Sequence, residues 1–373
     1  ELAPAVAGLL DDEAGRARTG ARCRELAEAR RGATARALNH IREANDGALV
    51  LPPRFNPLSP LWRAGVAVDR ALSHLRLDLP GRPVVSVGNL AMGGTGKTPF
   101  VIWLCQRLAA RGLKPAVLTR GYKRESSEAV TTLLPGESAP VAVTGEEPQL
   151  ILRSGSAALA IGADRQAARW ALEQRFHADV YVLDDGFQHW RMRRDLDIVL
   201  IDALDPFRGG VFPRGRLREP FSALCRAGAI VITRAEPGRR YGALVEEIRS
   251  HSPATPIFFA SVQASIPELP PDAAIGAFCG LGQPESFRRT LSSLGIEPIL
   301  FEQFPDHHRY SAADLEPLAA RAGVLLTTEK DLLNIDPALA HRCRIAAVPA
   351  RIEVDDEARL IELVMGCLAP AQQ

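Results

Sequence analysis

Residues 86–99 read SVGNLAMGGTGKTP, a glycine-rich loop that ends in Gly-Lys-Thr. An apolar run at residues 84–87 precedes the loop, and a helical pattern at residues 98–111 follows it. In such a strand–loop–helix unit, glycines let backbone N–H groups surround a phosphate. The strict P-loop pattern has glycine where this chain has Ala91, with two glycines further along the loop instead. A chance glycine-rich turn is the alternative, but the flanking pattern favours a phosphate-binding loop.

The end of this loop carries the residues expected to bind a nucleotide. Lys97 would reach its β- and γ-phosphates, and the Thr98 hydroxyl would bind Mg²⁺. The expected nucleotide contacts are Gly93, Gly94, Thr95, Gly96, Lys97 and Thr98.

A second motif lies at residues 180–189, which read VYVLDDGFQH. The apolar strand would deliver Asp184 and Asp185 to its carboxyl end, beside the P-loop. Two adjacent carboxylates repel each other unless a cation lies nearby, so we expect one of them to bind Mg²⁺. Gln188 and His189 would then contact substrate or phosphate. The alternative is a capped turn after a core strand.

The rest of the chain from residue 83 alternates short apolar runs with helical stretches. Runs of this kind are typical of strands buried on both faces of a parallel sheet. They lie at residues 84–87, 116–119, 158–161, 180–183, 198–201 and 230–233. We therefore expect an α/β fold of P-loop NTPase type, with a parallel sheet flanked by helices. A proline-rich linker at residues 266–272 would lead into a smaller C-terminal α/β domain.

Composition limits the class of protein. The 373 residues are 46% hydrophobic and carry a net charge of +1, which argues against both disorder and a globally basic nucleic-acid binder. Six cysteines lie far apart with no C-x-x-C pair, so we expect no disulfide scaffold and a reducing cytoplasm. No apolar run is long enough to span a bilayer and none resembles a signal peptide. A soluble or membrane-surface protein is expected.

Two segments precede the P-loop. Residues 1–46 are rich in Ala, Arg and Glu at helical spacing, so residues 1–52 are expected to form a helical extension. The first residue is Glu1 rather than Met, and we expect the natural chain to begin earlier or to be processed. Residues 59–76 then form an amphipathic helix with Trp62 and three arginines. That pattern is typical of a membrane-surface helix, and also of a helix packed on the domain.

The motifs together closely resemble the tetraacyldisaccharide 4'-kinase family, the lipid A 4'-kinases. The P-loop and the DDGFQH string carry most of the resemblance, and further matches follow in the family's order to the C-terminus. These are residues 120–122 (RGY), 162–165 (GADR), 217–220 (LREP), 304–310 (FPDHHRY) and 328–331 (TEKD). Residues 1–46 weakly resemble the C-terminal end of a Kdo transferase and contain no catalytic motif.

The resemblance implies ATP-dependent phosphorylation of the 4'-hydroxyl of an acylated glucosamine disaccharide 1-phosphate, giving lipid IVA. It implies a peripheral enzyme on the cytoplasmic face of the bacterial inner membrane, with ATP and Mg²⁺ as cofactors and no nucleic-acid partner. It also favours the membrane-surface interpretation of the Trp62 helix. Residues 53–265 would be the kinase domain, and residues 266–373 a smaller domain that closes over the active site.

The resemblance also assigns roles to residues at matching positions. Asp184 or Asp185 and Glu219 would be the metal-associated carboxylates, Arg165 would face the phosphates, and Gln188 lies in a matched string. Asp306 and His307 resemble a carboxylate–imidazole pair near the acceptor hydroxyl; taken alone, they could be a polar turn or a metal site. The family has Gly-Asp-Glu-Pro where this chain has GEEP at residues 145–148. The family's candidate general base therefore falls on Glu146, whose side chain is one methylene longer.

A P-loop ATPase switch that acts on a protein partner is the competing interpretation. It accounts for the P-loop and the paired aspartates equally well. It gives no role to Asp306 and His307 in a second domain, or to the amphipathic helix. A guanine-nucleotide switch would need an Asn-Lys-x-Asp string, which the sequence lacks.

Overall fold

The computed structural model describes residues 59–74, 77–122, 124–270, 273–282 and 284–368. The chain divides into two compact units. One unit comprises residues 1–51 and 238–247, of which only 238–247 are described. The other comprises residues 52–237 and 248–373 and contains both β-sheets and all the residues discussed below. The predicted helical extension lies outside the described residues.

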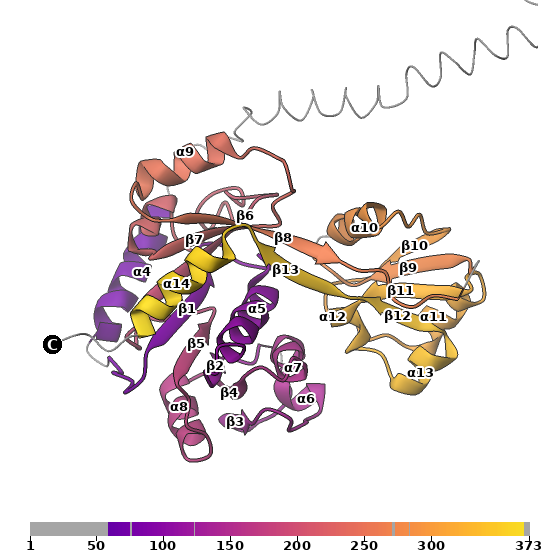
Figure 1. The fold of residues 1–373 in the computed structure, drawn as a ribbon, viewed down its shortest axis with the longest axis horizontal. Helices are drawn as coiled ribbons and strands as arrows, with labels where there is room; N and C mark the ends of the chain where they lie inside the picture. The colour runs from indigo at the N-terminus through magenta and orange to yellow at the C-terminus, as the bar shows by residue number, and fades with distance from the viewer. Residues whose placement is uncertain (1–58, 75–76, 123, 271–272, 283, 369–373) are drawn as a thin grey trace, which may run out of the picture. The chain divides into compact units, whose positions relative to one another are not determined.

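Within the described residues, nine strands form one mixed, mostly parallel sheet in the order β13-β8-β7-β6-β1-β5-β2-β4-β3 (Figure 1). Six of the nine were predicted from the apolar runs, and they are confirmed as parallel neighbours: β1 (Val84–Asn89), β2 (Pro115–Thr119), β4 (Ala158–Gly162), β5 (Val180–Asp184), β6 (Leu196–Asp202) and β7 (Ala229–Thr233). The P-loop strand β1 lies between β5 and β6, so the Asp184 strand is its direct neighbour.

Three strands were not predicted. Strand β3 (Val130–Leu133) pairs antiparallel with β4, and β8 (Ile257–Ala264) pairs parallel with β7. After the smaller sheet, the chain returns as β13 (Ala350–Val354), which pairs antiparallel with β8. The sheet is therefore parallel in its centre and antiparallel at both edges.

Side chains along each strand alternate between the two faces of the large sheet, so both faces carry apolar side chains that must be buried. Helices cover both faces. Helix α5 (Lys97–Ala109) packs on one face with α7 (Glu146–Arg153) and α14 (Glu357–Leu368). Helix α8 (Arg165–Glu173) packs on the other. The predicted crossover helices are thus confirmed as α5 and α8. The remaining elements are α4 (Ser59–His74), α6 (Val141–Thr144), the 3₁₀ helix η1 (Phe221–Arg226) and α9 (Gly242–His251).

A smaller parallel sheet of four described strands has the order β10-β9-β11-β12. Its elements are β9 (Ile275–Cys279), α10 (Pro284–Ser293), β10 (Leu300–Gln303), α11 (Ala312–Ala319), β11 (Val324–Thr328), α12 (Glu329–Leu332), α13 (Pro337–Arg342) and β12 (Ile345–Val348). Phe287 and Leu291 of α10 pack on one side of the sheet, and Leu315 and Leu318 of α11 pack in a second cluster. This sheet follows the predicted linker.

Helix α4 lies within the predicted amphipathic segment. Its indole Trp62 packs against Phe212 at 4.7 Å between ring centroids and donates a hydrogen bond of 2.8 Å to the backbone oxygen of Arg218. Val68 and Leu72, further along the helix, are 57% and 60% exposed. The first turn of the helix therefore contacts the domain, whereas two apolar side chains of its later turns face solvent.

Candidate active site

The P-loop connects β1 to α5 through a backbone that only glycine adopts without strain at two points. Gly93 has a φ of 97° and Gly96, which caps α5, a φ of 80°. Asn89 at the end of β1 donates a 2.8 Å hydrogen bond to the Thr95 hydroxyl, and the Thr233 hydroxyl donates one of 2.8 Å to the Thr95 carbonyl. These bonds hold the loop in place at the start of helix α5, where backbone N–H groups favour an anion.

A cluster of one aspartate and two arginines holds the P-loop backbone in place. Asp202 at the end of β6 pairs with Arg208 at 2.5 Å and also with Arg234. Both arginines donate to the Gly94 carbonyl, at 3.0 and 3.3 Å. The Asp202 carboxylate therefore anchors two arginines on the P-loop.

Asp184 ends β5 and is 4% exposed. Its Oδ2 accepts a 2.9 Å hydrogen bond from Thr119, whereas its buried Oδ1 has no protein partner. Burial, with added repulsion from Glu147 and Asp185, raises the pKa of Asp184 to about 6. A buried carboxylate oxygen without a donor, beside a second carboxylate, fits a bound cation.

Asp185 has a φ of 53°, an unfavourable value for a residue with a side chain and one that recurs at functional sites. Its carboxylate lies 3.5 Å from Lys97 Nζ and 3.0 Å from Arg218 Nη1. Burial acts to raise the pKa of Asp185, but the charges of Lys97 and Arg218 outweigh it and hold the pKa below its ordinary value. Asp185 therefore stays ionised next to the P-loop lysine.

Arg218 links this carboxylate to two other predicted residues. Its Nη1 donates to Gln188 Oε1 at 3.1 Å, and Gln188 Nε2 donates to Glu219 Oε1 at 3.0 Å. Glu219 is buried and pairs with Arg226 at 2.9 Å. The structure thus brings Asp185, Gln188 and Glu219 into one network, although Glu219 is paired with an arginine.

Arg165 is the first residue of α8 and is 6% exposed. Its Nη1 donates to the carbonyls of Gly162 and Ala163 at 3.0 and 3.3 Å, and its buried Nε has no protein partner. Burial lowers its pKa, and the charges of Asp184 and Asp185 act in the opposite direction. The positive charge of Arg165 therefore interacts with the carboxylates of Asp184 and Asp185 at the end of β5.

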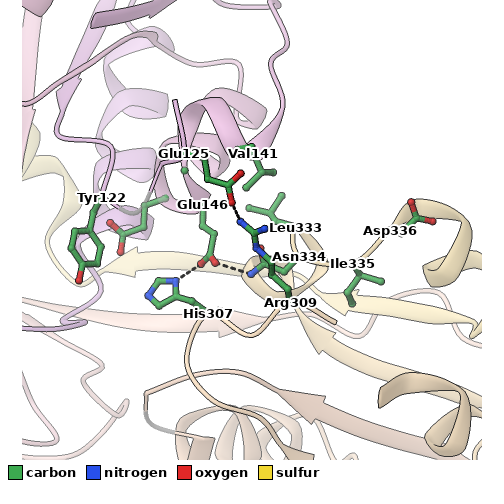
Figure 2. A pocket seen from close by; sticks show the side chains of 13 residues that line it. Tyr122, Glu125, Val141, Glu146, His307, Arg309, Leu333, Asn334, Ile335 and Asp336 are labelled. Carbon is green, nitrogen blue, oxygen red and sulfur yellow. Dashed lines mark hydrogen bonds and ion pairs between the residues drawn. The ribbon is translucent and has the colours of Figure 1, made fainter. Parts of the chain in front are cut away.

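A second group of predicted residues forms around His307, which has a φ of 66°. His307 Nδ1 lies 2.6 Å from Glu146 Oε2, and Asn334 donates to Glu146 Oε1 at 2.8 Å (Figure 2). Burial acts to raise the pKa of Glu146, but the bonds from His307 and Asn334, with the charge of Lys330, leave it below the ordinary value. Asp306 is 3.6 Å from His307 Nε2. The structure therefore brings Glu146, Asp306 and His307 together.

Of this group, Glu146, His307 and Asn334 line a cavity of about 300 Å³. Figure 2 shows these three side chains. Glu125 and Arg309 form an ion pair in its wall, and Leu333 and Ile335 add apolar surface. Glu147 also lines the cavity, and its charge raises the pKa of Asp184. The cavity wall therefore lies within electrostatic range of Asp184. Helix α7, which carries Glu146 and Glu147, packs on α5, which begins at Lys97.

Several residues of these groups could not be identified from the sequence alone. Arg218 and Lys330 lie inside matched motifs, but their spacing gives no sign of which carboxylate they contact. Asn334 and Arg226 had no sequence signal. Among the described residues, no group of three or more His, Cys, Asp or Glu side chains is arranged to hold a metal ion, and His308 pairs with Asp314 at 3.2 Å.

A P-loop beside paired carboxylates, next to a cavity with a carboxylate–imidazole pair, defines a P-loop phosphotransferase. The family model described as tetraacyldisaccharide-1-P 4'-kinase matches residues 53–369. The chain belongs to this family, and it is a kinase of lipid A biosynthesis.

Individual relatives support the same family assignment. The chain is 40% identical over 337 residues to a tetraacyldisaccharide 4'-kinase of Anaeromyxobacter dehalogenans, covering 82% of this chain and 88% of that protein. It is 39% identical over 330 residues to one from Koribacter versatilis, covering 83% and 98%. The crystal structure of Aquifex aeolicus LpxK in complex with ATP matches with a TM-score of 0.67 and 28% identity, covering 84% of this chain and 98% of that one. The resemblance of residues 1–46 to a Kdo transferase stays a prediction, since the family match begins after them.

Proposed function

We propose that this kinase transfers the γ-phosphoryl group of ATP to the 4'-hydroxyl of a tetraacylated glucosamine disaccharide 1-phosphate. The observation that carries the proposal is the adjacency of two sites. Glu147 lines the cavity beside His307 and also acts electrostatically on Asp184 next to the P-loop. A phosphoryl acceptor in the cavity would therefore lie near a donor held on the P-loop.

The P-loop residues Gly93, Gly94, Thr95, Gly96, Lys97 and Thr98 would hold the phosphates of ATP, as the ATP complex of the Aquifex relative supports. The loop backbone and Lys97 would offset phosphate charge, and Arg165 would add a fixed positive charge. Gln188 would position Asp185 and Glu219 through the Arg218 network. These roles are charge neutralisation and positioning, on which phosphoryl transfer depends most.

Thr98, Asp184 and Asp185 would hold Mg²⁺, with Glu219 as a further candidate. The unpartnered Oδ1 of Asp184 fits that role, because its burial would otherwise be uncompensated. When bound, Mg²⁺ supplies positive charge that offsets the charge on the transferred group. Thr98→Val keeps the side-chain shape but removes the hydroxyl, so it should raise the Mg²⁺ concentration needed for half-maximal rate. An unchanged Mg²⁺ dependence would remove Thr98 from the metal site.

The Glu146–His307 pair would serve as the general base. Glu146 already accepts from His307 and Asn334, so the open nitrogen of the pair is His307 Nε2. We propose that Nε2 takes the proton of the 4'-hydroxyl as that oxygen bonds to the γ-phosphorus and the bond to the β-phosphate oxygen breaks. Glu146 would orient the imidazole and stabilise its positive charge, as a carboxylate does in other carboxylate–histidine pairs.

We further propose that residues 53–265 bind ATP and that, within residues 266–373, the part with the smaller sheet closes over the site. Strand β13 of that segment belongs to the large sheet, and helix α14 packs on it. Support comes from Glu146, in the first segment, which contacts His307 and Lys330 of the second. Residues 1–52 would take no part in the chemistry.

The α4 helix would lie on the cytoplasmic face of the inner membrane. Val68 and Leu72 are exposed, and the exposed side chains of Arg63 and Arg70 on the same helix could meet anionic headgroups. No helix in the described residues is long and apolar enough to cross a membrane. We propose a peripheral contact with the bilayer through α4, which would bring the cavity to an acylated substrate.

The activity is tested by incubating the protein with labelled ATP and the acylated disaccharide 1-phosphate. A labelled lipid is expected, and a matched substrate with hydrogen in place of the 4'-hydroxyl should stay unlabelled. Release of phosphate without a labelled lipid would contradict the proposal and favour the ATPase switch.

A further inference from the structure

His307 lies between two carboxylates. Its Nδ1 is 2.6 Å from Glu146, and its Nε2 is 3.6 Å from Asp306. A carboxylate that faces Nε2 favours an N–H donor at that nitrogen. A ring that already carries a proton on Nε2 cannot accept one from a hydroxyl. The site therefore needs a way to offset the charge of Asp306.

Lys330 meets this need. Its Nζ lies 2.9 Å from Asp306 Oδ1 and 3.6 Å from Glu146 Oε2, and its side chain is 21% exposed. Of the two carboxylates, Asp306 is therefore the closer partner of the ammonium group. Since an ammonium is a compact charge with three donors, it can bind both carboxylates at once.

The backbone that carries Lys330 is firmly held. Its neighbour Asp331 is 1% exposed and accepts hydrogen bonds from the Tyr310 hydroxyl at 2.9 Å and from the Gly280 N–H at 3.0 Å. The Thr328 hydroxyl also accepts from the Asp331 N–H at 3.1 Å. Lys330 thus projects from an anchored turn, which fixes where its charge lies.

Other charged groups near the pair either have partners of their own or are acidic. Arg309 pairs with Glu125 in the cavity wall, and His308 pairs with Asp314. The remaining charged residues that line the cavity are Glu147 and Asp336. Since both of these are acidic, Lys330 is the cation among the described residues that binds the two carboxylates beside His307.

We propose that Lys330 is a positioning residue of this kinase: it binds Asp306 and Glu146 and thereby keeps His307 Nε2 free to accept the proton of the acceptor hydroxyl. This inference rests on the proposed base role of the Glu146–His307 pair. It predicts that, without the Lys330 charge, the rate begins to fall at a higher pH as the solution is made more acidic.

The test is the pH profile of kcat, with labelled ATP and the lipid disaccharide both saturating. Lys330→Met should move the acid limb up by about one pH unit, the scale of one unit charge near a partly exposed group. Lys330→Arg keeps the charge and should leave the limb in place. Lys114→Met, which removes an exposed lysine charge elsewhere on the domain, is the matched control and should also leave it in place.

A double variant separates charge balance from a structural role. If Lys330 acts by offsetting Asp306, removing both charges in Lys330→Met with Asp306→Asn should return the limb toward that of the parent enzyme. An unmoved limb in Lys330→Met, or no return in the double variant, overturns the inference. A parent enzyme that labels no lipid would instead refute the proposed function, so the two failures are distinguishable.

Discussion

Replacing Glu146 by Gln is the most direct test of the base. The change keeps the size of the side chain but removes the charge that accepts from His307 Nδ1 at 2.6 Å and from Asn334 at 2.8 Å. An amide has one accepting oxygen, so one of these two donors would face an NH₂ group. A hydrogen bond to a charged group is worth about 1.5–3 kcal/mol. If this hydrogen bond stabilises the transition state of proton transfer by that amount, its loss lowers kcat about 10- to 150-fold.

The KM for ATP should change little, because the phosphate-binding loop lies elsewhere. The assay is steady-state transfer of label from ATP to the lipid disaccharide at neutral pH, with circular dichroism to check that the variant is folded. Glu146→Asp keeps the carboxylate, so it should lose less activity than Glu146→Gln. Full activity in Glu146→Gln, together with a defect in Glu147→Gln, would show that the neighbouring carboxylate has the role instead.

Further predictions concern the P-loop, the helix α4 and pH. Lys97→Ala and Asp185→Ala should each lower kcat by orders of magnitude with the fold intact. Near-parental turnover at saturating Mg-ATP would show that the phosphates bind elsewhere. Val68→Asp with Leu72→Asp should abolish flotation with anionic vesicles but spare the melting temperature, because both side chains are exposed; unchanged flotation would argue against a membrane role. Burial and nearby arginines lower the pKa of His189 to about 4, so the unfolded chain binds more protons than the folded one between that value and about 6.5. Acidification through this window should destabilise the protein, and His189→Gln should reduce the resulting drop in melting temperature; an equal drop would refute the assignment.

The centre of the fold was predictable because its signals are local. Residues 84–87 and 180–183 are apolar on both faces, and a parallel sheet covered on both sides requires that pattern. The edges were not predictable in the same way. Strand β8 reads IFFASVQA, with only two of its eight residues buried, and its partner β13 lies beyond the whole smaller sheet. A pairing of that kind depends on tertiary packing rather than on the period of either segment.

The candidate site likewise has a part that the sequence predicts and a part that it does not. The P-loop and the Asp184–Asp185 pair are contiguous in sequence, so their placement follows from one strand–loop–helix unit. Lys330 and Asn334 reach Glu146 from the far end of the chain. Neither spacing nor residue type indicates that approach, so the partners of the predicted base appear only in the folded structure.

The pairing of β8 with β13 bears on how the chain folds as it is synthesised. Ala264 and Ala350 lie opposite each other in the two strands, yet the entire four-stranded sheet is made between them. Until β13 leaves the ribosome, β8 has an unpaired edge of the kind that promotes aggregation. The nascent chain would therefore carry an open edge while the inserted sheet forms, and β13 would complete the large sheet only late in synthesis.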